Sequence, residues 1–180
     1  MSYEQELALA IALAEEAGSV AQEFQRRGLQ TETKADESPV TAADRACEKL
    51  IVEGIAKAFP ADGVLGEEGA NRTGESGRRW IVDPIDGTKD SVRGIPLWGI
   101  LIALEQDGEV IVGVAHSPGQ KLLLSAAKGQ GTFANGSRLR VSDVTDPGRA
   151  VLSFNGFNKV GVTALAPRLL SWVGKFWAVR

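Results

Sequence analysis

From residue 97 onward the sequence repeats one pattern, in which short apolar runs alternate with residues that favour tight turns. Asp107-Gly108 and Asn135-Gly136 are typical of two-residue hairpin turns, because both central residues of such a turn need a positive φ. The pattern predicts a meander of antiparallel strands. The expected strands cover residues 98–104, 109–115, 121–126, 132–134 and 137–141.

Two amphipathic helices are predicted before this meander. The first covers residues 3–25, where apolar side chains recur at steps of three and four. The second runs from Ala42 to Phe59, with Thr41 suited to cap its first turn and Pro60 to end it. Residues 28–39, between the helices, are too hydrophilic for a core element. Helices packed on one face of a mainly antiparallel sheet make an α+β fold.

Two short strands are expected between the second helix and the meander. They are Val64-Leu65 and Trp80-Ile81-Val82, and residues 70–79 between them have the composition of a loop. A strand at 150–154 and an apolar segment at 165–173 follow the meander.

Composition excludes several classes of function. With 20 Lys and Arg against 23 Asp and Glu, the net charge of −3 gives no electrostatic case for binding nucleic acid. One Cys and one His exclude a cysteine-based zinc site and a His-rich metal site. The first 24 residues carry five Glu and no Lys or Arg, unlike a targeting signal, and no apolar run approaches the roughly 20 residues of a membrane span. We therefore expect a cytoplasmic protein with no membrane partner.

Three carboxylates stand where apolar strands give way to loops, namely Glu67, Asp83 and Asp86. Pro84 fixes its own φ and restricts Asp83, which favours a turn that brings the two aspartates together. Converging carboxylates repel one another, and a divalent cation would offset that repulsion. Oxygen ligands without His or Cys favour Mg²⁺. Gly87 and Thr88, at the start of an expected helical turn, offer N–H groups to a phosphate.

Simpler interpretations stand beside these. The acidic loops could be solvated turns whose aspartates cap neighbouring backbone. Asp44, three residues after Thr41, could complete a capping box or lie near a metal. Lys34 suits a surface position, and His116 has no second His or Cys near it in the sequence, which favours a structural role.

Residues 80–88, Trp-Ile-Val-Asp-Pro-Ile-Asp-Gly-Thr, resemble the first signature of the inositol monophosphatase family of Mg²⁺-dependent phosphatases. Gly66-Glu67-Glu68 and residues 39–44 precede it in the order of the family, and residues 94–98 and 135–136 also resemble the family pattern. The similarity covers residues 5–155 and is strongest to the histidinol-phosphatase branch of histidine biosynthesis.

The resemblance implies a fold and a domain organisation. Residues 1–155 would form the N-terminal metal- and phosphate-binding part of the αβαβα sugar-phosphatase fold, and residues 156–180 would begin a second α/β domain. Family members continue into a half that carries a Trp-Asp motif, whose Asp completes the second metal site. No Trp-Asp pair occurs in this chain. We therefore expect a truncated chain, a chain completed by a partner, or a degenerate one that binds Mg²⁺ and phosphate without turnover.

The resemblance also implies roles for single residues. The expected ligands of two or three Mg²⁺ ions are Glu67, Asp83, the carbonyl of Ile85 and Asp86. The expected catalytic residues around the attacking water are Glu67, Thr88 and Asp44. Asp86, Gly87 and Thr88 would bind the substrate phosphate, and Lys34 would lie at the entrance. The expected substrate is a small phosphate ester, with histidinol phosphate before inositol monophosphate, and a homodimer is a further expectation.

Overall fold

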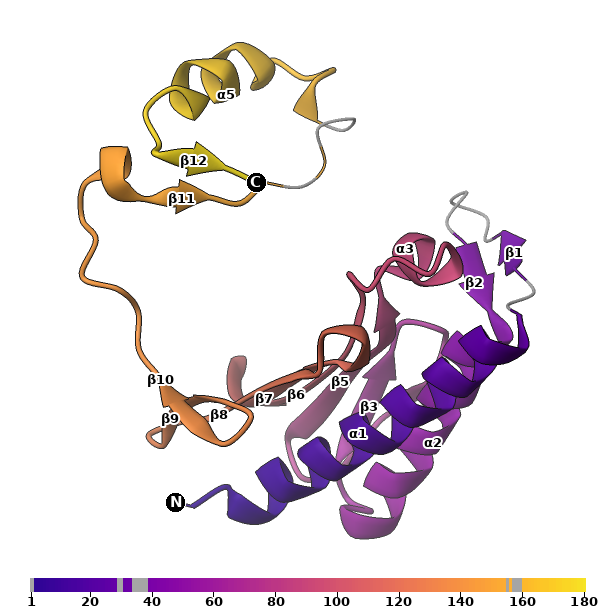
Figure 1. Ribbon diagram of the computed structural model, residues 1–180. Helices are drawn as coiled ribbons and strands as arrows, with labels where there is room; N and C mark the ends of the chain where they lie inside the picture. The colour runs from indigo at the N-terminus through magenta and orange to yellow at the C-terminus, as the bar shows by residue number, and fades with distance from the viewer. Residues whose placement is uncertain (1, 29–30, 34–38, 155, 157–159) are drawn as a thin grey trace. The chain divides into compact units, whose positions relative to one another are not determined.

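The computed structural model describes residues 2–28, 31–33, 39–154, 156 and 160–180. The chain packs as two compact units, Met1–Leu139 and Arg140–Arg180 (Figure 1). The boundary predicted after residue 155 is a different one, because it separates the two domains expected for the complete family fold. It stays a prediction.

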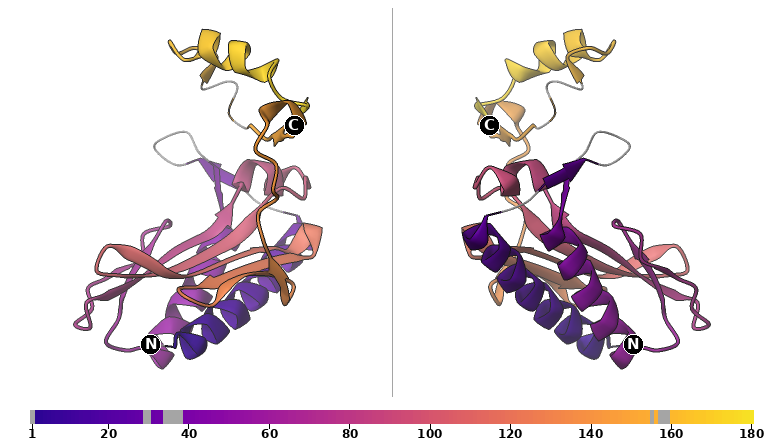
Figure 2. Two further views of the ribbon diagram at one scale, coloured as in Figure 1. Left: turned by 90° about the vertical axis from the view of Figure 1, so that its left-hand side faces the viewer. Right: turned by 90° about the vertical axis from the view of Figure 1, so that its right-hand side faces the viewer.

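The first unit is built on a sheet of eight strands in the order β10-β9-β8-β7-β6-β5-β3-β4. Helices α1 (Glu4–Arg27) and α2 (Ala42–Ala58) lie together on one face of this sheet (Figures 1 and 2). The α+β fold predicted from the sequence is confirmed. The strands are β3 (Gly63–Gly66), β4 (Asn71–Arg72), β5 (Arg78–Asp86), β6 (Gly99–Gln106), β7 (Glu109–Ser117), β8 (Leu122–Ala127), β9 (Gly131–Ala134) and β10 (Ser137–Leu139).

The shorter elements of this unit lie around the sheet. Strands β1 (Thr31–Thr33) and β2 (Pro39–Thr41) pair as a separate two-stranded hairpin. Helix α3 (Thr88–Val92) follows β5, and the 3₁₀ turn η1 (Pro118–Gln120) joins β7 to β8. No described helix is both long and apolar enough to cross a bilayer.

The core forms where the helices meet the sheet, and the sequence shows the alternation of apolar residues that builds it. Along β6, Ile100, Ile102 and Leu104 are buried while the residues between them are partly exposed, as expected when alternate side chains point to opposite faces. Alanines form much of the buried stripe of α1, and small residues let the helices approach closely. A Cβ added at Gly54 of α2 would lie 2.4 Å from a methyl carbon of Leu13 of α1.

The meander follows the predicted order of strands and turns. Asp107 and Asn135 have φ values of 54° and 47°, and the glycine after each is also positive, as the predicted hairpin turns require. One segment differs from prediction. Residues 70–79 are not all loop, because they contain β4 and the first two residues of β5. The hydrophilic stretch 28–39 contains β1, whose partner is β2 rather than a strand of the main sheet.

The second unit is small. It contains a 3₁₀ turn, η2 (Pro147–Arg149), strands β11 (Val151–Leu152) and β12 (Ala178–Val179), which pair in parallel, and helix α5 (Ala166–Val173). Several of its large apolar side chains are exposed, among them Leu170, Trp172 and Trp177.

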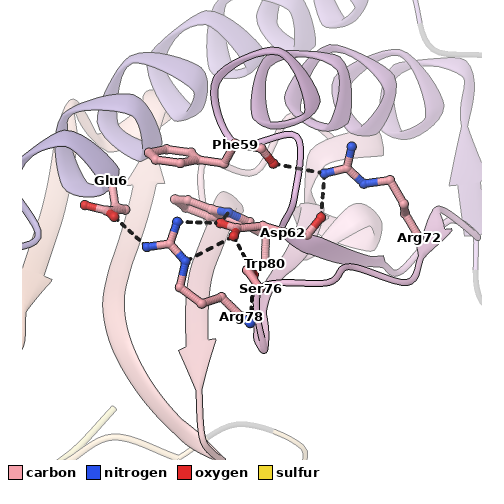
Figure 3. Close-up of polar contacts among 7 residues, drawn as sticks. All are labelled: Glu6, Phe59, Asp62, Arg72, Ser76, Arg78 and Trp80. Carbon is pink, nitrogen blue, oxygen red and sulfur yellow. Dashed lines mark hydrogen bonds and ion pairs between the residues drawn. The ribbon is translucent and has the colours of Figure 1, made fainter.

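A polar cluster holds the beginning of β5 to the end of α2 (Figure 3). The Asp62 carboxylate, 2% exposed, accepts hydrogen bonds from the Arg78 guanidinium at 2.9 and 3.0 Å, from Ser76 Oγ at 2.7 Å and from Trp80 Nε1 at 2.9 Å. Arg78 also donates to Glu6 of α1 at 2.6 Å. The buried carboxylate therefore joins α1, the loop after α2 and β5.

The pKa of Asp62 reflects this cluster. Burial would raise the pKa, but the hydrogen bonds from Arg78, Ser76 and Trp80 outweigh it, and the pKa is lowered. The folded chain therefore holds the ionised form more strongly than the unfolded chain does. The resulting stabilisation is fully present above the unfolded-state pKa of about 4 and is lost as the pH falls through the lower folded-state pKa.

We expect Asp62→Asn to lower the free energy of unfolding by about 2 kcal/mol at pH 7, since it weakens hydrogen bonds to a charged, buried acceptor. Urea unfolding at several pH values measures the effect. The difference from the unsubstituted chain should shrink as the pH falls below about 4. Asp143→Asn, at an exposed position, makes the same charge change and should leave stability unaltered. A constant Asp62→Asn deficit down to the lowest pH would contradict the assigned ionisation.

Candidate metal and phosphate site

Among the described strands of the main sheet, the one parallel pairing brings the acidic loops together. Strands β3 and β5 run in parallel, with Gly66 opposite Val82. The next residues along the two strands are Glu67 and Asp83, and the Glu67 N–H donates to the Val82 carbonyl at 3.0 Å. Because the carboxyl ends of parallel strands meet at one edge, two carboxylates 16 residues apart in sequence become neighbours.

The pairing of β5 with β6 shifts in register between Asp83 and Asp86, the stretch that contains Pro84. Asp83 pairs with Leu101 of β6, but Asp86 pairs with Gly99, so β5 contains one residue more than its partner over this stretch. Proline has no N–H to donate to the ladder, and such positions favour bulges. Three residues apart, the two aspartates would face opposite sides of a regular strand. The extra residue interrupts this alternation, and the charge of Asp86 acts on Asp83.

Asp83 is the electrostatic centre of this group. Burial raises its pKa to about 7, assisted by a hydrogen bond with Glu67 and by the negative charges of Glu67 and Asp86. Its Oδ1 atom is buried and accepts no hydrogen bond from any described residue. An acceptor oxygen without a donor is costly inside a protein, and a cation would satisfy it.

Asp44 joins the site from α2. Its Oδ2 accepts the Thr41 N–H at 2.9 Å and the Thr41 hydroxyl, which with the reciprocal cap makes a complete capping box. Its Oδ1 lies 3.3 Å from the Thr88 hydroxyl, which is also 3.1 Å from the Ile85 carbonyl. The capping interpretation is thus confirmed, and the same carboxylate also contacts the loop that follows β5.

Gly87 and α3 complete the loop. Gly87 has a φ of 90°, and a Cβ added there would lie 2.7 Å from the Leu97 carbonyl oxygen, so the position requires glycine. The amide of Gln25, near the end of α1, donates to the backbone and hydroxyl oxygens of Ser91 at 2.9 and 3.1 Å. The long first helix therefore anchors the short third one.

The residues present suit a hard divalent cation. The donors available are carboxylate and carbonyl oxygens, which Mg²⁺ prefers over His or Cys. Across the described part of the chain, no three His, Cys, Asp or Glu side chains already stand as a formed metal site. Glu67 and Asp83 instead share a hydrogen bond. The orphaned oxygen of Asp83 is the feature that fits the ion.

Other predicted residues fall in different places. Lys34 lies outside the described residues. Nδ1 of His116 lies 3.0 Å from the Ala14 carbonyl of α1, a contact consistent with a structural role. Sequence reasoning missed Glu48, which is buried on α2 and hydrogen-bonded to the Glu67 loop. The sequence did contain a sign of this role. Glu48 is a charged residue one helical turn after Asp44, on the apolar face of the helix that also carries Ile51 and Ile55.

The sequence is similar to those of known proteins. The sequence profile described as the inositol monophosphatase family matches residues 2–165. A histidinol-phosphatase of Chlorobaculum parvum is 45% identical over 150 residues, which cover 83% of this chain and 58% of that protein. A histidinol-phosphatase of Mycobacterium tuberculosis is 42% identical over 181 residues, which cover 97% of this chain and 70% of that protein.

A solved structure shares the fold. The extragenic suppressor protein SuhB from Bartonella henselae superposes with a TM-score of 0.91 at 31% identity, covering 98% of this chain and 69% of that one. The chain belongs to the inositol monophosphatase family. It spans a little over half the length of the Chlorobaculum relative, at 58%.

Asp83→Asn should stabilise the chain in the absence of divalent ions, by about 1 kcal/mol in free energy of unfolding, because it removes a crowded negative charge. The same change should abolish stabilisation by added Mg²⁺. Thermal unfolding in EDTA and in MgCl₂ measures both effects. Asp107→Asn, in the exposed β6–β7 turn, is the charge-matched control and should change neither. Equal Mg²⁺ stabilisation of Asp83→Asn and the unsubstituted chain would refute Asp83 as a ligand.

Proposed function

We propose that this chain forms the metal- and phosphate-binding part of a Mg²⁺-dependent phosphomonoesterase. The observation that carries the proposal is the buried, unpartnered Oδ1 of Asp83 beside the carboxylate of Glu67. Membership of the inositol monophosphatase family supports it. The proposed metal ligands are Glu67, Asp83, the Ile85 carbonyl and Asp86. A divalent cation held there would supply the positive charge that phosphoryl transfer to water needs.

Two residues are proposed to orient the attacking water. The Thr88 hydroxyl has two acceptors within reach, Asp44 Oδ1 and the Ile85 carbonyl, so its proton is directed away from the open side of the site. Its lone pairs are then free to accept a hydrogen bond from water. Glu67 is the carboxylate suited to accept a proton from the same water, since it lies beside Asp83 at the strand edge.

The substrate phosphate is proposed to sit against the Gly87 turn. Gly87 has no side chain to obstruct an approaching phosphate, and the first N–H groups of α3 are donors without intrahelical acceptors. Asp86 is exposed, unlike Asp83, and is therefore placed to contact both a cation and the substrate.

Histidinol phosphate is the substrate we favour. Both relatives described above carry the name histidinol-phosphatase, at 45% and 42% identity. Inositol monophosphate comes second, because the family profile carries that description. A cytoplasmic location and a homodimer stay predictions.

Phosphate release from histidinol phosphate and from inositol monophosphate, with and without Mg²⁺, tests the proposal on the 180-residue chain. We expect Mg²⁺-dependent release, faster from histidinol phosphate. Asp86→Asn should lower the rate by about 100-fold or more, the usual loss when a group that stabilises transition-state charge is removed.

Asp107→Asn, in the β6–β7 turn at the opposite end of β6 from Gly99, is the control and should keep full activity. Full activity of Asp86→Asn would contradict the proposed role of Asp86 in binding the cation and the substrate. Mg²⁺ binding without phosphate release from either ester would favour the second candidate, a non-catalytic Mg²⁺- and phosphate-binding protein.

A further inference from the structure

Helix α2 carries two buried carboxylates one turn apart on the same face. Asp44 is 1% exposed and Glu48 is 6% exposed. Like charges at this spacing destabilise a helix, and burial adds a desolvation cost for each ion. Such a pair persists only where each carboxylate has strong partners. Asp44 has Thr41 and Thr88, so it serves the loop after β5.

Glu48 serves the other loop of the site. Its Oε2 accepts the Glu68 N–H at 2.8 Å, and its Oε1 accepts the Ala70 N–H at 2.9 Å. Hydrogen bonds from backbone N–H groups to an ionised carboxylate are about twice as strong as neutral ones. Both oxygens are thus used to hold backbone, and both donors lie within three residues after Glu67.

The backbone before Glu67 is shaped to admit this carboxylate. A Cβ added at Gly66 would lie 2.2 Å from Glu48 Oε2, so the carboxylate packs directly on the glycine. The Gly66 N–H donates to the Ala70 carbonyl at 2.7 Å, which closes the loop on itself. Any side chain at position 66 would displace Glu48 or the loop.

We propose that Glu48 is a positioning residue that holds the Glu67 carboxylate beside Asp83. The backbone of Glu67 is fixed on its amino side by the pairing of β3 with β5, and on its carboxyl side by Glu48. Without Glu48 the second anchor is lost. The Glu67 carboxylate is then no longer held close enough to Asp83 for the two to bind one cation between them. The inference rests on the proposed function, because it assigns Glu67 to the metal.

Glu48→Gln is the principal test. The amide keeps one acceptor but turns an NH₂ group toward one of the two backbone donors. Hydrogen exchange followed by NMR should show the Glu68 and Ala70 amides exchanging at least about tenfold faster. Calorimetric titration with MgCl₂ should show affinity weakened by about 10- to 100-fold, as when an outer partner of a metal ligand is removed. Glu48→Asp should restore part of both properties.

Two further variants make the test specific. Glu53→Gln makes the same change on the same helix at a side chain that is 69% exposed, and it should alter neither property. Gly66→Ala disturbs the same contact by adding a methyl group where the Glu48 carboxylate packs. It should reproduce both the faster amide exchange and the weaker Mg²⁺ binding, and it provides a second test if Glu48→Gln does not fold.

The outcomes separate the inference from the function on which it rests. Unchanged exchange at Glu68 and Ala70, or unchanged Mg²⁺ affinity, in folded Glu48→Gln overturns the positioning role. Failure of the unsubstituted chain to bind Mg²⁺ overturns the proposed function and, with it, the assignment of Glu67. In that case the exchange measurement still reports whether Glu48 holds the loop.

Discussion

The parallel pairing of β3 with β5 is the constraint on which the rest of the site depends. All other described pairings in the main sheet are antiparallel, and they build a frame without bringing distant loops to one edge. The β3–β5 pair differs because its two carboxyl ends coincide. The pairing of the two strands brings Glu67 and Asp83 to the same edge of the sheet.

This arrangement brings the negative charges of Glu67, Asp83 and Asp86 close together, and the three carboxylates repel one another. Backbone pairing of β5 with β3 and with β6 holds the strands that carry or precede these carboxylates, and the charges of Glu67 and Asp86 both act on Asp83. Burial first, and then the neighbouring carboxylates, raise the pKa of Asp83 to about 7. Strained charges of this kind cluster at functional sites, where a ligand relieves them.

Helix α2 acts as the support for both acidic loops. Its first turn presents Asp44 to Thr88, and the next turn presents Glu48 to the backbone beyond Glu67. At the opposite end of β5, Asp62 and Arg78 join the strand to the loop after α2 and to α1 (Figure 3). Contacts from α2 and from the loop that follows it therefore reach both ends of the strand that carries the aspartates.

The sequence by itself determined the α+β class, the hairpin turns and the candidate acids, because these follow from local rules. The Asp-Gly and Asn-Gly pairs of the β6–β7 and β9–β10 turns adopt the positive φ that such hairpins require, apolar periodicity marks a helix face, and residues 80–88 carry a family signature. The role of Glu48 could not be read in this way, because its partners lie 20 and 22 residues away. Only the tertiary structure decided that β3 and β5 run in parallel, which puts Glu67 beside Asp83. Strand direction and register depend on long-range backbone pairing, which no local pattern in the sequence specifies.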